Sequence, residues 1–265
     1  SVIDTDGNIG SSRVAGIYDT PYGPYIAFAL KDAGHVYIVD YSKPDYPIVG
    51  DIPNIGKILH DGFLNEGKEI GRYLFQASQG SDVMGVVDFK TKSLVTKIYT
   101  GPSAKPHPGQ GSSWYNERLG QQLGATVNMN LGQVTIWDSN FDVIRQIPTA
   151  GGGLFIGTSE HTPFLWADNV LGGPTNWNKI YLINKQTLET DRILTVGAKE
   201  GTITDPVSHK AMYSWKVPTV KDKDGKVISP RILHAEPANH GHWTMVSEWN
   251  AGRIGIYEAK TGEFV

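Results

Sequence analysis

The segment His35-Val-Tyr-Ile-Val-Asp40 alternates apolar side chains, ends in an acidic residue and is followed by a polar turn. The same unit returns as Val83-Met-Gly-Val-Val-Asp88, Val134-Thr-Ile-Trp-Asp138, Ile180-Tyr-Leu-Ile-Asn184 and Ile254-Gly-Ile-Tyr-Glu258. Alternation with a period of two residues is typical of β-strands. The ends of these segments lie 48, 50, 46 and 74 residues apart. Such a period indicates propeller blades, because one four-stranded sheet cannot bury both of its faces alone.

This repeat predicts an all-β fold, a β-propeller of four-stranded blades with about five blades in one domain over residues 1–265. The residues that end the repeated segments should occupy equivalent strand ends in successive blades: Asp40, Asp88, Asp138 and Asn184. The 31 glycines and 15 prolines separate short apolar runs, as in other all-β proteins. The long final interval predicts an insertion over residues 216–230, where Lys221-Asp-Lys-Asp-Gly225 is typical of an exposed hairpin tip.

The composition excludes several classes of function. The formal net charge is −3 and no block of lysine or arginine occurs, so we expect neither nucleic acid nor an anionic membrane surface as a partner. The absence of cysteine excludes disulfides, thiolate metal sites and the covalent attachment of c-type heme. The sequence has no run of about 18 apolar residues and no basic segment followed by an apolar one at its start. We therefore expect neither a membrane span nor a signal peptide in it.

Two histidines occupy equivalent positions in consecutive repeats. The segment Ile58-Leu-His-Asp-Gly62 begins 18 residues after Asp40, and Lys105-Pro-His-Pro-Gly109 begins 17 residues after Asp88. In a propeller these loops surround the axis on one face, so His60 and His107 should share one mouth, with ring nitrogens within about 10 Å. An imidazole can bind an anion when charged and can exchange a proton near neutral pH. The alternative is a structural or surface role for each histidine.

Four motifs follow one another after the strand pair in residues 13–40: Leu59-His-Asp-Gly62, Lys105-Pro-His-Pro-Gly-Gln-Gly111, Gly151-Gly-Gly-Leu-Phe-Ile156 and Ser247-Glu-Trp-Asn250. In order and spacing they resemble the d1-heme domain of the cytochrome cd1 nitrite reductase family. The likeness runs along nearly the whole chain but covers only the later part of a family domain. It therefore implies an incomplete propeller, part of an eight-bladed ring that further blades or another chain would complete.

This resemblance implies a cofactor, a reaction and a site. Heme d1 would be the cofactor, and the protein would reduce nitrite to nitric oxide in the periplasm, with a c-type cytochrome as electron donor. His60 and His107 would lie on the distal side of the heme, bind nitrite and donate protons. Further contacts to the cofactor would come from Gly109, Gln110, Gly152, Gly153, His234 and Trp249. The histidine that ligates the heme iron in the family would come from outside this chain.

The sequence leaves two other functions open. Gln110 stands where the nitrite reductases have an arginine that can meet a heme carboxylate, so the resemblance also implies a heme d1 biosynthesis protein, a dehydrogenase or a carrier. A non-catalytic interaction propeller would need no tetrapyrrole. His240 and His242 have the spacing of a metal-binding tract, but they precede a strand at a turn where exposed polar residues are expected. We therefore predict no metal site.

Overall fold

The structure is a computed structural model that describes residues 2–4, 6–197, 200–205, 207–216, 219–238 and 240–265. Its regular elements are short antiparallel β-strands. The only helical element among the described residues is a single turn, η1 (Trp249–Ala251). The all-β class predicted from the repeat is confirmed.

Four sheets each contain four consecutive strands, and we number them blades 1 to 4. Blade 1 comprises β3 (Val14–Thr20), β4 (Tyr25–Leu30), β5 (His35–Asp40) and β6 (Ile48–Ile52). Blade 2 comprises β7 (Leu59–Leu64), β8 (Tyr73–Ser78), β9 (Val83–Asp88) and β10 (Ser93–Tyr99). Blade 3 comprises β11 (Ser112–Asn116), β12 (Gln121–Val127), β13 (Gln133–Trp137) and β14 (Val143–Pro148). Blade 4 comprises β15 (Ile156–Gly157), β16 (Phe164–Asp168), β17 (Lys179–Asn184) and β18 (Thr190–Thr195). The predicted four-stranded blades are confirmed.

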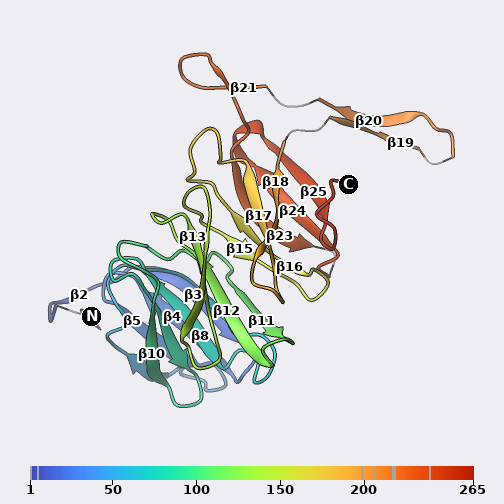
Figure 1. The fold of residues 1–265 in the computed structure, drawn as a ribbon. Helices are drawn as coiled ribbons and strands as arrows, with labels where there is room; N and C mark the ends of the chain where they lie inside the picture. Colours follow the sequence, from blue (N-terminus) through green and yellow to red (C-terminus); the bar gives the residue numbers. More distant parts are fainter. Residues whose placement is uncertain (1, 5, 198–199, 206, 217–218, 239) are drawn as a thin grey trace.

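Blade 5 has three strands, β23 (Ile232–Ala238), β24 (Trp243–Glu248) and β25 (Arg253–Glu258). The insertion before it is longer than the predicted residues 216–230, and its two hairpins project from the body (Figure 1). They are formed by β19 (Gly201–Thr204) with β20 (Ala211–Trp215) and by β21 (Val220–Lys221) with β22 (Val227–Ile228). A short hairpin of β1 (Val2–Ile3) and β2 (Ile9–Gly10) precedes blade 1. In the described part of the chain, no helix has the length and apolarity to cross a membrane.

The repeated acidic or amide residue closes the turn between the third and fourth strands of a blade. Asp40, Asp88 and Asn184 end their strands, and Asp138 directly follows β13. A side-chain oxygen of each accepts a hydrogen bond from the backbone N–H two residues later, at 2.8–2.9 Å. Short side chains with an acceptor oxygen can reach their own backbone in this way, and carboxylates and amides do so more strongly than hydroxyls. The predicted equivalence of the four positions is confirmed, and the turn geometry explains the residue type.

Apolar faces of successive blades pack against each other and form the cores. Between blades 1 and 2, Val36 and Ile38 share a cluster with Leu74. Between blades 2 and 3, Trp137 is 1% exposed and its ring lies 5.2 Å from that of Phe75, measured between centroids. Two further clusters join blade 3 to blade 4 and blade 4 to blade 5. Each inner blade therefore buries both faces, as the propeller prediction requires.

The blades follow one another along an arc, with blade 1 and blade 5 at its ends (Figure 1). Each end blade has one apolar face that no other described blade covers. Ile17 of β3 is 60% exposed and Ile254 of β25 is 63% exposed. Val246 and Tyr257, on the opposite face of blade 5, are buried in the cluster shared with blade 4. The described residues thus form an open arc, in agreement with the incomplete ring that the resemblance implies.

Candidate functional site

A cavity of about 510 Å³ lies where the first strands of all five blades begin or approach the axis. Each blade contributes at least one residue to its wall: Tyr18, His60, Gln110, Phe155 and Leu233. The volume lies within the range of small-molecule sites, and the wall combines apolar side chains with a few polar ones, as such sites do. The cavity is therefore the candidate functional site.

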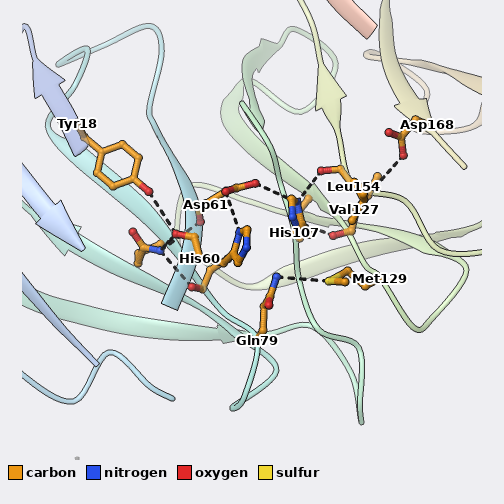
Figure 2. A network of polar contacts seen from close by, with 12 residues as sticks. Tyr18, His60, Asp61, Gln79, His107, Val127, Met129, Leu154 and Asp168 are labelled. Carbon is orange, nitrogen blue, oxygen red and sulfur yellow. Dashed lines mark hydrogen bonds and ion pairs between the residues drawn. The ribbon is translucent and has the colours of Figure 1, made fainter. Parts of the chain in front are cut away.

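His60, Asp61 and His107 form one polar cluster on this wall (Figure 2). Asp61 Oδ1 lies 2.8 Å from His60 Nδ1, and Asp61 Oδ2 lies 3.0 Å from His107 Nδ1. The two ring centroids are 4.6 Å apart. The structure thus brings the two predicted histidines together at one mouth. Because both Nδ1 atoms face the carboxylate, each ring keeps its proton there and leaves Nε2 for a ligand.

The electrostatics of the cluster favour a neutral imidazole beside an ionised carboxylate. Burial lowers the pKa of His107, and the charge of Asp61 offsets this effect only in part. Burial alone would raise the pKa of Asp61, but the hydrogen bond from His60 and the charges of both histidines outweigh it, and the pKa is lowered. At neutral pH, His107 can therefore accept a proton from a ligand while Asp61 stabilises the resulting charge.

A bulge in β7 lets the side chains of His60 and Asp61 both face the cavity. The pairing of β7 with β8 shifts between Leu59 and Gly62, so two adjacent residues can both reach the cavity. Gln76 of β8 holds the freed backbone, since its Nε2 donates to the carbonyl oxygens of His60 at 2.5 Å and Asp61 at 3.2 Å. Sequence reasoning assigned Asp61 no role, although its position directly after His60 in the motif is a signal that could have found it.

Backbone contacts fix His107 just before β11. Its N–H donates to the carbonyl oxygen of Val127 at 3.0 Å, and its Nδ1 lies 2.8 Å from the carbonyl oxygen of Leu154 (Figure 2). Leu154 directly follows the run of three glycines. A Cβ on Gly152 would lie 1.7 Å from the carbonyl oxygen of Met129. That glycine therefore permits close backbone packing behind the wall, and it does not line the cavity.

Gln110 connects blade 3 to blade 5 across the inner edge of blade 4. Its Nε2 lies 2.6 Å from His234 Nε2 and also contacts the carboxylate of Glu236, which lies 2.5 Å from the same imidazole nitrogen. The ring of Phe155 stacks on His234 at 4.2 Å and lies 5.8 Å from the ring of His107. His234 has a φ of 72° at a bulge in β23, a strained conformation that is common at functional sites. Sequence reasoning missed Phe155 and Glu236.

The other predicted contact residues have different surroundings. Gly109 lines the cavity, and a Cβ there would lie 2.2 Å from the ring of Phe155. Gly153 lies behind the wall, against Asp168. Trp249 lies in η1, is 59% exposed, and has the guanidinium carbon of Arg231 5.4 Å from its ring centroid. It follows the second strand of blade 5, and the structure does not bring it to the cavity wall.

The ligand atoms of His60, Asp61 and His107 lie within 4.8 Å of one another, a spacing that could suit a metal ion. Both imidazole Nδ1 atoms already contact the Asp61 carboxylate, so we interpret the cluster as a hydrogen-bonded network. Within the described residues, His240 and His242 join no such group. The ring of His242 instead stacks on His161, with centroids 4.1 Å apart.

A family model described as the cytochrome D1 heme domain matches residues 1–265. The chain is 26% identical over 257 residues to dihydro-heme d1 dehydrogenase from Pseudomonas aeruginosa, a match that covers 96% of this chain and 44% of the relative. A shorter match to Protein NirF of the same organism is 35% identical over 78 residues, covering 29% of this chain and 19% of NirF. The chain thus matches less than half the length of either relative.

Solved structures agree on the fold. Dihydro-heme d1 dehydrogenase NirN in complex with DHE superimposes with a TM-score of 0.70 at 24% identity, over 100% of this chain and 48% of that one. Hydrazine synthase of Kuenenia stuttgartiensis superimposes with a TM-score of 0.53 at 15% identity, over 96% of this chain and 79% of that one. At these identities the likeness shows the β-propeller fold alone.

Proposed function

Because the chain belongs to the cytochrome D1 heme domain family, we propose that it binds a d1-type heme at the histidine cavity and takes part in heme d1 maturation, as a dehydrogenase of dihydro-heme d1. The tetrapyrrole is then the substrate of the protein. Nitrite reduction, with heme d1 as a resident cofactor, is the alternative reading.

The observation that carries this proposal is the pair of imidazoles held by one carboxylate on the cavity wall. Dehydrogenation of a saturated side chain removes two protons and two electrons. His107 is neutral at neutral pH because burial lowers its pKa, so its Nε2 can take up a proton, and Asp61 steadies the imidazolium that forms. The second proton passes to Nε2 of His60, the other imidazole on the wall, or to solvent. The two electrons leave one at a time to two equivalents of a one-electron acceptor outside the described chain, a role for which a c-type cytochrome is suited.

Three glycines on the wall leave room for a flat macrocycle. Gly16, Gly62 and Gly109 lie on it and come from blades 1, 2 and 3, so the backbone rather than side chains faces the cavity at these positions. Phe155 offers an aromatic edge beside Gly109. These residues would hold the face of the tetrapyrrole, and the two histidines would meet its polar groups.

Two observations favour maturation over nitrite reduction. Gln110, at the position of an arginine in the nitrite reductases, contacts His234 and Glu236 and supplies no cation for a heme carboxylate. The relative matched over 96% of this chain is named as a dihydro-heme d1 dehydrogenase. The pair of histidines would serve either reaction, because imidazoles both bind anions and transfer protons.

The test supplies the purified chain separately with dihydro-heme d1 and with heme d1. We expect binding of dihydro-heme d1, seen as a change in its visible spectrum. With an oxidised c-type cytochrome present, we expect loss of two hydrogen atoms from the tetrapyrrole by mass spectrometry. Nitric oxide release from nitrite and a chemical reductant on the heme d1-loaded protein would instead support the alternative. Failure to bind either tetrapyrrole would refute both readings.

Replacement of the paired histidines tests their role. His60→Ala should change the melting temperature little, because His60 belongs to no apolar core, whereas His107→Ala should lower it, because that side chain is buried and hydrogen-bonded to Leu154. In both variants turnover per folded molecule should fall by about 100-fold or more. His35→Ala is the matched control, since His35 also contacts a carboxylate, Asp51 at 2.7 Å, but lies outside the cavity wall. Turnover per folded molecule should survive that change. Equal turnover in all three variants would remove the histidines from the mechanism.

A further inference from the structure

Asp168 is a buried acid directly behind the candidate site. It ends β16 and is 1% exposed. Its Oδ1 accepts a hydrogen bond from the N–H of Leu154 at 2.8 Å (Figure 2), and its Oδ2 has no hydrogen-bond partner among the described residues. Burial raises the pKa of this carboxyl group to about 6. A carboxyl group in such surroundings is costly to the fold, because a buried charge normally needs a cationic partner.

The same position in blade 5 shows how a purely structural acid is accommodated. Glu248 ends β24, the second strand of its blade as β16 is of blade 4, and it is also fully buried. Its carboxylate is paired with Arg253, whose Nε lies 2.5 Å from Oε2. No described lysine, arginine or histidine side chain forms such a pair with Asp168. In blade 4 backbone N–H groups, that of Leu154 first, take the place of such a cation, so the surroundings of Asp168 lead to the peptide of Leu154.

The peptide of Leu154 joins Asp168 to His107. Its N–H donates to Asp168, and its carbonyl oxygen lies 2.8 Å from His107 Nδ1. A carboxylate that accepts from a peptide N–H makes the carbonyl oxygen of that peptide a stronger acceptor, since chains of hydrogen bonds polarise one another. The glycine run permits this approach, because a Cβ on Gly153 would lie 2.7 Å from the carbonyl oxygen and 2.9 Å from Oδ1 of Asp168.

We propose that Asp168 is a positioning residue for His107: through the Leu154 peptide it keeps the proton of the imidazole on Nδ1, leaves Nε2 toward the cavity, and strengthens the affinity of the ring for a second proton. Asp61 and Asp168 then act on the same Nδ1, one directly and one through a peptide. The inference rests on the assignment of His107 to the ligand site. It concerns the state of the ring itself, which can be measured without a tetrapyrrole.

The test is a nuclear magnetic resonance titration of the histidine rings in the tetrapyrrole-free chain. Wild type, Asp168→Asn and Asp168→Ala are compared, with Glu248→Gln as the matched control. Asparagine keeps an acceptor for the Leu154 N–H but loses the charge, so His107 should titrate at lower pH in Asp168→Asn while its Nδ1–H tautomer persists. In Asp168→Ala the acceptor is also lost, and the two tautomers of His107 should mix. The ring signals of His35, in another blade, should be the same in all variants at each pH.

A merely structural acid would give a different pattern. If Asp168→Asn and Asp168→Ala lower the melting temperature but leave both the titration and the tautomer of His107 as in wild type, the proposal is wrong. The asparagine variant keeps the test decisive should the alanine variant fail to fold. A failure of heme binding would not alter these spectra, so it can be told apart from a failure of this inference.

Discussion

Asp61 joins the two histidines of the candidate site. It contacts the Nδ1 atoms of His60 and His107 at 2.8 and 3.0 Å, so one carboxylate orients two imidazoles. With both rings neutral the cluster carries one negative charge, and with both protonated it carries one positive charge. The cluster can therefore accept protons while its rings are neutral and bind an anion when both are protonated. This range of states suits a family that handles an anionic tetrapyrrole.

The raised pKa of Asp168, the buried acid behind His107, predicts how the free energy of unfolding changes with pH. The pKa of Asp168 is 3.8 in an unfolded chain and about 6 in the fold, so between these values the folded state binds more protons. Its contribution to the free energy of unfolding is greatest below pH 3.8 and falls, by about 3 kcal/mol, as the pH rises to 6. Asp168→Asn removes this loss. Relative to wild type, the variant should gain stability between pH 4 and pH 7 in urea denaturation.

Asp88→Asn is the control of opposite sign. Burial alone would raise the pKa of Asp88, but the hydrogen bonds from Arg72 outweigh it and the pKa is lowered. Ionised Asp88 therefore stabilises the fold above its unfolded pKa, and that contribution is lost as the pH falls through the folded value. Asp88→Asn should lose most stability at neutral pH. Parallel pH curves for the two variants would contradict the assignment of a raised pKa to Asp168.

The site could be predicted from sequence only as far as local pattern reaches. His60 and His107 were found because they occupy equivalent places in consecutive repeats. Asp168 and Phe155 carry no such signal, since their roles depend on the approach of blade 4 to the loop before β11. The place of Trp249 could not be predicted, because the long insertion before blade 5 obscures which of its strands is the innermost.

At the scale of elements, the turn between the third and fourth strands of a blade is the unit that the sequence repeats. Its carboxylate or amide and the alternating strand before it are both local, which is why the blades could be predicted from the sequence. The bulges in β7 and β23 could not, because they depend on the register with a partner strand. These two irregularities carry His60 and His234. The regular strand pairing thus forms the blades, and the two bulges place residues of the candidate site.

The turn itself can be tested in blade 3. Asp138 Oδ1 accepts hydrogen bonds from the N–H groups of Asn140 at 2.9 Å and Asp142 at 3.0 Å. Asp138→Ala removes both, so the free energy of unfolding should fall by about 1–3 kcal/mol. Asp142→Ala is the control, because in that turn Asp142 contributes its backbone and its side chain is exposed. Equal stability of the two variants in urea denaturation would show that the repeated acid does not hold the turn.

At the scale of the whole molecule, the two ends of the arc each expose an apolar face that no described blade covers. Every inner blade buries both faces, whereas blades 1 and 5 each leave one uncovered among the described residues. Exposed apolar faces of this kind mark surfaces that associate. Further blades or another chain would cover both faces, and blades 1 and 5, which carry these faces, also contribute Tyr18 and Leu233 to the wall of the histidine cavity.

The two exposed end faces predict self-association of the 265-residue chain when nothing else covers them. Ile17 on blade 1 and Ile254 on blade 5 are the probes, at 60% and 63% exposure. Ile17→Lys and Ile254→Lys each place a charge in the interface and should raise the dissociation constant at least about tenfold in sedimentation velocity across a concentration series. Val143→Lys, on the outermost strand of blade 3, changes an equally apolar residue that is 39% exposed but lies on neither end face. It should associate like wild type, because blade 3 is already covered on both sides. A chain that stays monomeric at every concentration, with all three variants alike, would mean that the end faces need no cover and that the open arc is stable alone.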